Sequence, residues 1–300
     1  MIKSLQELVD AVKVNETKTI AVAVAEDQDI MDIVKRSSEL RIADFILIGD
    51  AIKIKKMVSK NGLGFKTVEI IDAVNDEEAA QKTVALALEG KCDVVMKGNL
   101  QTATFLKAVF NKDAGFRKGS LITQISVYDK FYGEGLQLLT DCAMTVFPTL
   151  EDKKAIIENA VDLAIKLGYD KPRVALLSAL EVVNTKIQDT IDAAILSKMG
   201  DRGQIKNAII DGPFALDNAV SLEAAQHKNI TGPVAGQADI LIAPNLQVGN
   251  VLTKALVYFA KRNVAAAIMG AAKPIVMTSR TDTVENKMLS LAISLYISGR

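Results

Sequence analysis

Short apolar runs alternate with stretches of helical periodicity along the chain, and this alternation restricts the fold more than any other feature of the sequence. The clearest apolar runs are residues 19–25, 45–48, 93–96, 173–177, 208–210, 239–242, 265–269 and 274–277. Strands that alternate with helices are typical of a parallel sheet in an α/β fold. Because the runs are too continuously apolar for strands with one face in water, we expect helices on both sheet faces.

The alternation is interrupted once, between residues 115 and 148. There the helical period is lost and the pattern predicts a strand, a loop and a second strand, as in a hairpin. From residue 149 to about 270 the alternation resumes. A chain of 300 residues is long enough for two medium domains, so we interpret the hairpin as a change of domain.

Charge and residue counts exclude several classes of function. Lys plus Arg and Asp plus Glu both number 36, so no field of one sign draws the chain to nucleic acid or to an anionic membrane. A single His excludes a metal site built from several histidines. Cys92 and Cys142 have no metal-ligand spacing and are interpreted as core residues, and we expect a reduced, cytoplasmic setting. No apolar run approaches the ~20 residues of a membrane span, and residues 1–13 are typical of an amphipathic helix.

The end of the chain predicts a strand followed by a helix. The helical stripe consists of Val284, Met288, Leu291 and Leu295. Asp282 and Glu285 have the spacing of a capping box at its start. Ser279 and Arg280 therefore lie between a strand end and a helix N-terminus, where backbone N–H groups and the helix dipole favour an anion.

Polar or small residues follow three other predicted strands in the same way, at residues 96–99, 177–179 and 243–250. Each segment alone is also compatible with ordinary turn geometry. Together, and with a Lys and an Arg among them, they indicate a cleft for a phosphorylated ligand. Neither GxxxxGK[ST] nor GxGxxG after the first strand occurs, so a Walker-type or Rossmann nucleotide site is not supported. The lone His227 is interpreted as a surface residue.

Six ordered blocks carry a resemblance that covers essentially the whole chain. They are IAVAVAEDQDIMDIVKRSSELRIADFILIGD, MKGNLQTATFLKAV, LLTDCAMTVFPTLEDKKAIIENAVDLA, DGPFALDNAVS, APNLQVGNVLTKAL and MTSRTDT. With these blocks the chain resembles the phosphate acetyl/butyryltransferase family. The resemblance implies two α/β domains with mostly parallel sheets in an isocitrate dehydrogenase-like architecture, with the active site in an interdomain cleft. It also implies a homodimer or higher homo-oligomer, and a first domain of 1–114 plus 272–300 with a second of 115–271.

The family's reaction is the reversible transfer of an acyl group between coenzyme A and inorganic phosphate. Acyl-CoA and phosphate are thus the implied substrates, with no cofactor and no metal. The length and the TSRTDT block favour the butyryl branch, and phosphate acetyltransferase is the near alternative. Two further alternatives are a metal- and NAD-dependent dehydrogenase of related fold and a CoA- or phosphate-binding protein without turnover.

Matched to the family, Ser279 is implied as a hydrogen-bond donor and Arg280 as the cation on the acyl phosphate. Arg suits this role because its planar fork can hold two phosphate oxygens. The acetyltransferase branch places a proposed base for the CoA thiol seven residues after the Ser, but here that position is Asn286. Glu285 and Asp282 remain as candidate bases, and stabilisation of a thiolate by a nearby cation is the other option.

The remaining candidates are substrate-binding residues that follow the predicted strands. They are Lys97, Gly98, Thr102 and Lys107 in the second block, Ser178 at a strand end, and Asn245, Gly249, Asn250 and Lys254 in the fifth block. Lys107 falls where the acetyltransferases tend to have an Arg, and a Lys there is a point charge in place of a bidentate clamp.

Overall fold

A computed structural model describes the chain except residues 15, 65–66, 112–114, 117–118, 280 and 300. The described chain divides into two compact units. The first unit comprises Gln6–Ser120 and Ala265–Arg300, and the second comprises Met1–Leu5 and Leu121–Val264. The chain thus leaves the first unit near residue 120 and returns to it near residue 265.

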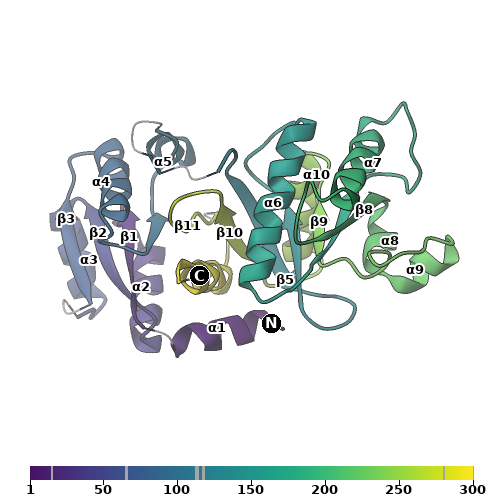
Figure 1. Ribbon diagram of the computed structural model, residues 1–300. Coiled ribbons are helices and arrows are strands. Elements are labelled where there is room, and N and C mark those ends of the chain that lie inside the picture. Colours follow the sequence, from purple (N-terminus) through teal and green to yellow (C-terminus); the bar gives the residue numbers. More distant parts are fainter. Residues whose placement is uncertain (15, 65–66, 112–114, 117–118, 280, 300) are drawn as a thin grey trace. The chain divides into compact units, whose positions relative to one another are not determined.

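The first unit contains a mostly parallel sheet (Figure 1). Its strands, in spatial order, are β3 (Val68–Asp72), β2 (Ala43–Gly49), β1 (Lys18–Ala23), β4 (Val94–Lys97), β11 (Ile275–Val276) and β10 (Ala265–Met269). Neighbouring strands from β3 to β11 run parallel, and β10 pairs with β11 antiparallel. The order reverses between β1 and β4, because the chain first moves outward to β3 and then crosses back.

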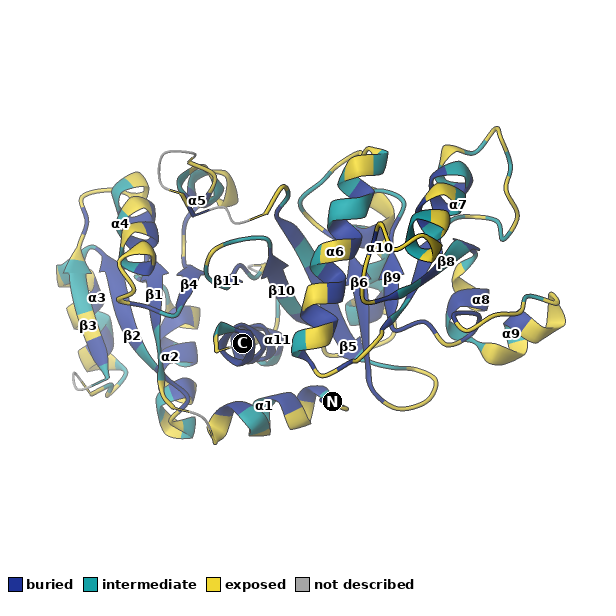
Figure 2. Cartoon of the chain, viewed as in Figure 1, coloured by how far each residue is buried: buried dark blue, intermediate teal, exposed yellow. Residues whose placement is uncertain are grey.

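The helices of the first unit are α1 (Leu5–Lys13), α2 (Gln28–Leu40), α3 (Ala51–Lys60), α4 (Asp76–Leu88), α5 (Thr102–Val109) and α11 (Val284–Ser298). Helices α2, α3, α4 and α11 contact the sheet, and α5 packs on α4 (Figure 2). Helix α4 packs on β1, β2 and β4, whereas α11 contacts α2, β10 and β11. Because the chain moves outward through α2 and α3 and back through α4, the right-handed rule for parallel crossovers puts α4 on the face opposite α2 and α3.

The second unit contains β5 (Thr123–Asp129), β6 (Leu136–Thr140), β9 (Ile240–Ile242), β7 (Arg173–Leu177) and β8 (Ile209–Phe214), in this spatial order. Strands β5 and β6 form the antiparallel hairpin, and β6, β9, β7 and β8 run parallel. Its helices are α6 (Leu150–Lys166), α7 (Gln188–Asp201), α8 (Leu216–Val220), α9 (Leu222–His227) and α10 (Leu246–Tyr258).

The predicted α/β fold is confirmed. Each of the eight apolar runs overlaps a strand, and the predicted hairpin is β5–β6. The prediction did not include β3, an edge strand whose sequence VEIID carries two acidic residues and only one buried position. His227 is exposed at the last position of α9, as predicted.

The start of the last helix differs from the predicted capping box. Thr283 is the N-cap, and its side chain accepts a hydrogen bond from the backbone N–H of Asn286. Helix α11 is also buried on all sides from Asn286 to Ile297, instead of along one stripe, while Val284 is 37% exposed. Most positions of this helix carry apolar or small residues, and Asn286 and Lys287 are buried with them, so a single stripe underestimates its burial. Among the described residues, no helix has the length and apolar character that crossing a membrane requires.

An ion-pair cluster fixes the amino ends of β7 and β9 in the second unit. The Asp239 carboxylate accepts hydrogen bonds from the backbone N–H and guanidinium of Arg173, at 2.9 to 3.0 Å, and from Lys130 Nζ at 2.5 Å. Burial alone raises the pKa of Asp239, but the hydrogen bonds from Arg173 and Lys130 outweigh it and hold this pKa below its usual range.

We expect Asp239→Asn to lower the free energy of unfolding at pH 7 by about 3 kcal/mol, since it leaves Lys130 and Arg173 without their counterion. The pKa of Asp239 is lower in the folded state than in the unfolded state. The stabilisation by its carboxylate is therefore fully present above the unfolded-state pKa of about 3.9, and it is lost as the pH falls through the folded-state pKa. Denaturant unfolding from pH 7 to pH 3 checks this. Asp162→Asn, at an exposed carboxylate paired with Lys166, is the control. A difference between wild type and Asp239→Asn that stays constant across this range contradicts the assignment.

Candidate functional site

The reversal of strand order between β1 and β4 creates a position at which α/β sheets commonly bind ligands. A small hollow lies there, beyond the carboxyl ends of β1, β4 and β11 and beside the first turns of α2 and α11. We call it the strand-end hollow. It is lined by Asp27, Asp29, Ile30, Ile33, Met96, Lys97, Gly98, Asn99, Thr278, Ser279 and Lys287. The structure therefore brings three of the predicted site residues together: Lys97, Gly98 and Ser279.

Gly98 and Lys97 shape the β4 side of the hollow. The Gly98 N–H donates to Ala23 O at 2.9 Å, and a Cβ on Gly98 would lie 2.2 Å from Val24 O, so only glycine fits against β1. The buried Lys97 ammonium donates to the carbonyl oxygens of Gly98 and Leu100, both at 3.0 Å. Lys97 thus holds the loop between β4 and α5 in place.

The turn between β11 and α11 positions Ser279. Its backbone N–H donates to the Asp282 carboxylate at 2.7 Å, and its hydroxyl lies 3.0 Å from that of Thr281. Asp282 therefore has a structural partner within this turn. Arg280 lies outside the described residues.

The other candidate base, Glu285, has a partner on α2. Arg36 donates to the Glu285 carboxylate at 2.8 Å, both side chains are a little over 40% exposed, and Glu285 does not line the hollow. Asn286 is only 4% exposed. A carboxylate at position 286 would be desolvated, which explains physically why an amide is suited to this site.

Sequence reasoning missed three charged residues that line the strand-end hollow. Asp27 is the N-cap of α2 and accepts from the Asp29 N–H at 2.8 Å. Asp29 forms an ion pair with Lys287, which lies in the first two turns of α11. Asp29 and Lys287 are 258 positions apart in sequence, so only the packing of α11 against α2 brings them together. Asp27 could have been found, because an Asp before an apolar-periodic run is a capping signal.

A second hollow, of about 620 Å³, lies in the second unit at the carboxyl ends of β7 and β9. We call it the apolar hollow, because most of its lining is aliphatic. It is lined by Leu177, Ser178, Ala179, Asp189, Leu216, Pro244, Asn245, Gln247, Val248, Val251, Leu252 and Ala255. The predicted residues Ser178 and Asn245 thus meet here. The Ser178 hydroxyl is buried and has no hydrogen-bond partner among the described residues, while Asn245 is the N-cap of α10 and accepts from Val248 N–H.

Gly249 and Asn250 hold α10 against the loop that follows β6. A Cβ on Gly249 would lie 2.2 Å from Asp141 O, and the Asn250 amide donates to Cys142 O at 3.2 Å. Both residues therefore have structural functions, and neither lines the apolar hollow. Lys254 is exposed further along the same helix.

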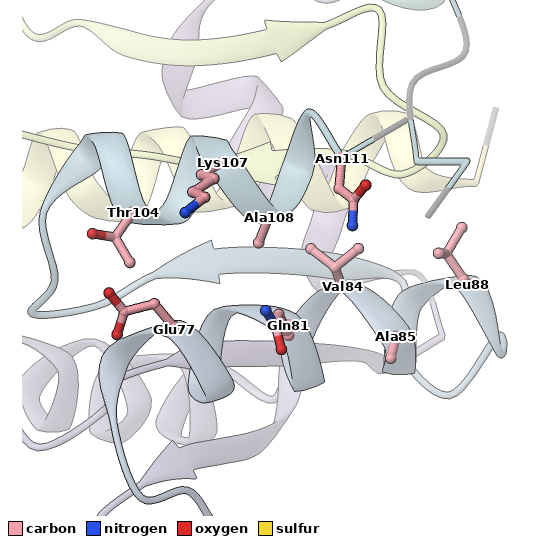
Figure 3. Close-up of a pocket in the computed structure, with 9 residues that line it drawn as sticks. All are labelled: Glu77, Gln81, Val84, Ala85, Leu88, Thr104, Lys107, Ala108 and Asn111. Carbon is pink, nitrogen blue, oxygen red and sulfur yellow. The ribbon is translucent and has the colours of Figure 1, made fainter. Parts of the chain in front are cut away.

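Two predicted residues on α5 lie elsewhere. Thr102 is exposed at the first position of the helix. Lys107 lines a groove of about 680 Å³ between α4 and α5, where Figure 3 shows it opposite Glu77 and Gln81. The groove is open and its charged side chains are exposed. The structure thus does not bring Lys107 into the strand-end hollow.

Both cysteine side chains are buried, as predicted. Burial raises the pKa of each thiol to about 11. Because the thiolate is the nucleophilic form, neither Cys92 nor Cys142 is suited to attack a substrate at neutral pH.

The chain is an α/β protein with a hollow at the carboxyl ends of parallel strands, the place at which such folds commonly bind ligands. The family model "Phosphate acetyl/butaryl transferase" matches residues 3–88 and 77–295. The chain belongs to this family, as its sequence blocks indicate.

Similar proteins support this assignment over the full length. A phosphate butyryltransferase from Clostridium beijerinckii is 44% identical over 100% of this chain and 99% of its own. A phosphate acetyltransferase from Thermotoga maritima is 41% identical over 97% of this chain and 98% of its own. The crystal structure of a branched-chain phosphotransacylase from Enterococcus faecalis has 31% identity and a TM-score of 0.84, and covers 94% of this chain and 99% of that one.

We expect both thiols of the native protein to react slowly with a chromogenic disulfide reagent at pH 7, and to react fully once the protein is unfolded. The reason is that burial holds both in the protonated form. The absorbance of the released chromophore, measured with and without denaturant, checks this. In the Cys92→Ser variant the remaining signal belongs to Cys142 alone. Rapid labelling of either thiol in the native protein contradicts it.

Proposed function

We propose that this protein is a phosphate butyryltransferase, which transfers a short acyl group reversibly between coenzyme A and inorganic phosphate. In the direction of acyl phosphate formation, a phosphate oxygen attacks the thioester carbonyl carbon. The new C–O bond forms, the C–S bond breaks, and CoA leaves as a thiolate. The nucleophile belongs to a substrate, which agrees with two buried cysteines of raised pKa.

The observation that carries the proposal is the place of Ser279 in the TSRTDT block. Ser279 follows β11 at its carboxyl end and lines the same hollow as Lys97 and Gly98 from the β4 block. Two sequence blocks that carry the family resemblance thus meet at one ligand-binding position of the fold. The identity of 44% to the Clostridium beijerinckii enzyme favours the butyryl branch.

The reaction needs a surface for a phosphoryl group and a surface for an apolar acyl chain. The strand-end hollow is a candidate for the former, with Ser279 as hydrogen-bond donor and Arg280 as a bidentate cation on the phosphoryl oxygens. The apolar hollow is a candidate for an aliphatic group, with Ser178 as its buried polar group.

The base for the CoA thiol stays open between a carboxylate and a nearby cation that stabilises the thiolate. Asp282 and Glu285 are less suited than the sequence indicates, because each already has a structural partner. The proposal includes no metal or nicotinamide cofactor. It also includes a reduced cytoplasmic setting and a homodimer or higher homo-oligomer, which size-exclusion chromatography with light scattering tests.

We expect phosphate-dependent release of CoA with the highest kcat/KM for butyryl-CoA among acetyl-, propionyl-, butyryl- and isobutyryl-CoA. Each methylene accounts for about 1 to 3 kcal/mol of discrimination, so adjacent chain lengths should differ by roughly 10- to 200-fold at most. Detection of the released thiol gives the rates.

The same assay separates the alternatives. A highest kcat/KM for acetyl-CoA identifies a phosphate acetyltransferase, and a highest value for isobutyryl-CoA identifies a branched-chain preference. Activity that persists with EDTA and without nicotinamide excludes the dehydrogenase alternative. Binding of acyl-CoA without any turnover identifies a binding protein and overturns the proposed function.

We expect Arg280→Ala to lower kcat/KM by about 10²- to 10³-fold, the usual cost of removing a donor that stabilises transition-state charge. The fold should be retained, as checked by circular dichroism and thermal unfolding. Arg202→Ala, at the exposed C-cap of α7, is the matched control and should keep wild-type activity. Near-normal activity of Arg280→Ala is incompatible with the proposed site.

A further inference from the structure

We propose that Lys287 binds the phosphoryl group of phosphate and of acyl phosphate, and that Asp29 is the counterion which this group displaces. This inference rests on the proposed function and adds to it a cation that the sequence blocks do not indicate. The argument begins with where Lys287 lies.

Lys287 is a buried cation in an electrostatically unfavourable place. It is the fourth residue of α11, close to the helix N-terminus, where the helix dipole opposes a positive charge. Its side chain is only 6% exposed. A lysine in such a position violates two local preferences at once, and such violations are concentrated at functional sites.

Lys287 lines the strand-end hollow together with Ser279. Among the described residues, its ion-pair partner is Asp29. An ammonium group carries three N–H donors, so one carboxylate does not exhaust its capacity. In the part of the chain that the structure describes, Asp29 is the one acceptor for this ammonium group, which leaves further donors for a ligand in the hollow.

Lys97, the other lysine of the hollow, is used differently. Its ammonium group donates to the backbone carbonyl oxygens of Gly98 and Leu100, and these hydrogen bonds stabilise the loop at the end of β4. Among the described residues, Lys287 pairs with a half-exposed carboxylate, whereas Lys97 is held by two backbone carbonyl groups.

Asp29 is suited to be displaced. Its side chain is 51% exposed, whereas that of Lys287 is 6% exposed, so Asp29 can turn into water at little cost while Lys287 cannot. Asp29 also belongs to the first turn of α2, where the helix dipole favours a second anion. An incoming phosphoryl group would thus take the place of the Asp29 carboxylate next to Lys287. In that position it would lie near the N-termini of both α2 and α11.

The size of the hollow agrees with a small anion. Its volume is about 50 Å³ and it is open to solvent, so it has room for a small anion such as one phosphoryl group. The ligand that the geometry points to is therefore phosphate or the phosphoryl end of an acyl phosphate.

Steady-state kinetics of Lys287→Met and Asp29→Asn test the proposal. Methionine keeps the length of the side chain and removes its charge. We expect Lys287→Met to raise KM for phosphate by about tenfold or more, as for the loss of a hydrogen bond to a charged group, and KM for butyryl-CoA by less than about threefold. Asp29→Asn should change KM for phosphate in the opposite direction, because it removes both a competing counterion and a repulsive charge.

The opposite signs distinguish ligand binding from a structural ion pair. If the pair only holds α2 to α11, both variants raise KM for phosphate and lower the melting temperature together, and the proposal is overturned. It is equally overturned if Lys287→Met lowers kcat and leaves KM for phosphate unchanged. If Lys287→Met does not fold, the decrease in KM expected for Asp29→Asn still decides.

Lys130→Met is the matched control. Lys130 is similarly enclosed, with a side chain 9% exposed, and pairs with Asp239 at the amino ends of the strands of the second unit. It should lower stability without a selective effect on phosphate. Should the wild type turn over no acyl-CoA, the proposed function fails by itself. Calorimetric titration with inorganic phosphate then tests Lys287 separately, because binding must weaken in Lys287→Met and strengthen in Asp29→Asn.

Discussion

The pairing of β11 with β4 is the constraint on which the candidate site depends. Only two residue pairs define it, Ile275 with Val95 and Val276 with Met96, together with the hydrogen bond from Val95 N–H to Pro274 O at 3.1 Å. Because the strands are parallel, their carboxyl ends meet at one edge of the sheet. The pairing thus brings the TSRTDT block beside the residues after β4, although about 180 positions separate them. Without it, Ser279 would have no defined position relative to Gly98, whereas Lys287 is also held by the packing of α11 on α2.

Close backbone packing then fixes the shape of the strand-end hollow. Gly98 and Asn99 continue the hydrogen bonds of β4 to β1 beyond the last strand residue, through Ala23 O and Val24 O. A side chain at 98 would force the two strand ends apart, since its Cβ would meet Val24 O at 2.2 Å. Lys97 spans the following turn with two hydrogen bonds to carbonyl groups. Position 98 therefore requires glycine for steric reasons, whether or not this residue contacts a ligand.

The sequence was sufficient for elements whose signal is local. Continuous apolar runs predicted the buried strands, and the loss of helical periodicity predicted the hairpin. The edge strand β3 has no such signal, because its burial is incomplete and it carries Glu69 and Asp72. The pairing of Asp29 with Lys287 depends on how α11 packs on α2, a tertiary contact that no periodicity encodes. The predicted capping box is wrong for a related reason. Both Asp282 and Thr283 have side chains suited to an N-cap, and Thr283 takes this position. Glu285 forms an ion pair with Arg36 of α2, a tertiary contact that the local sequence does not indicate.

A chain with no net charge must bind an anion through the local arrangement of its charges. In the strand-end hollow two lysines face two aspartates, so the side chains described there carry nearly balanced charge. What distinguishes them is solvent exposure: Lys97 and Lys287 are buried, while the Asp29 side chain is 51% exposed. If a phosphoryl group displaces Asp29 as we propose, the hollow gains positive charge when this carboxylate turns into water. In this proposal the difference in exposure between the lysines and Asp29, and not the count of charges, makes the hollow suited to an anion.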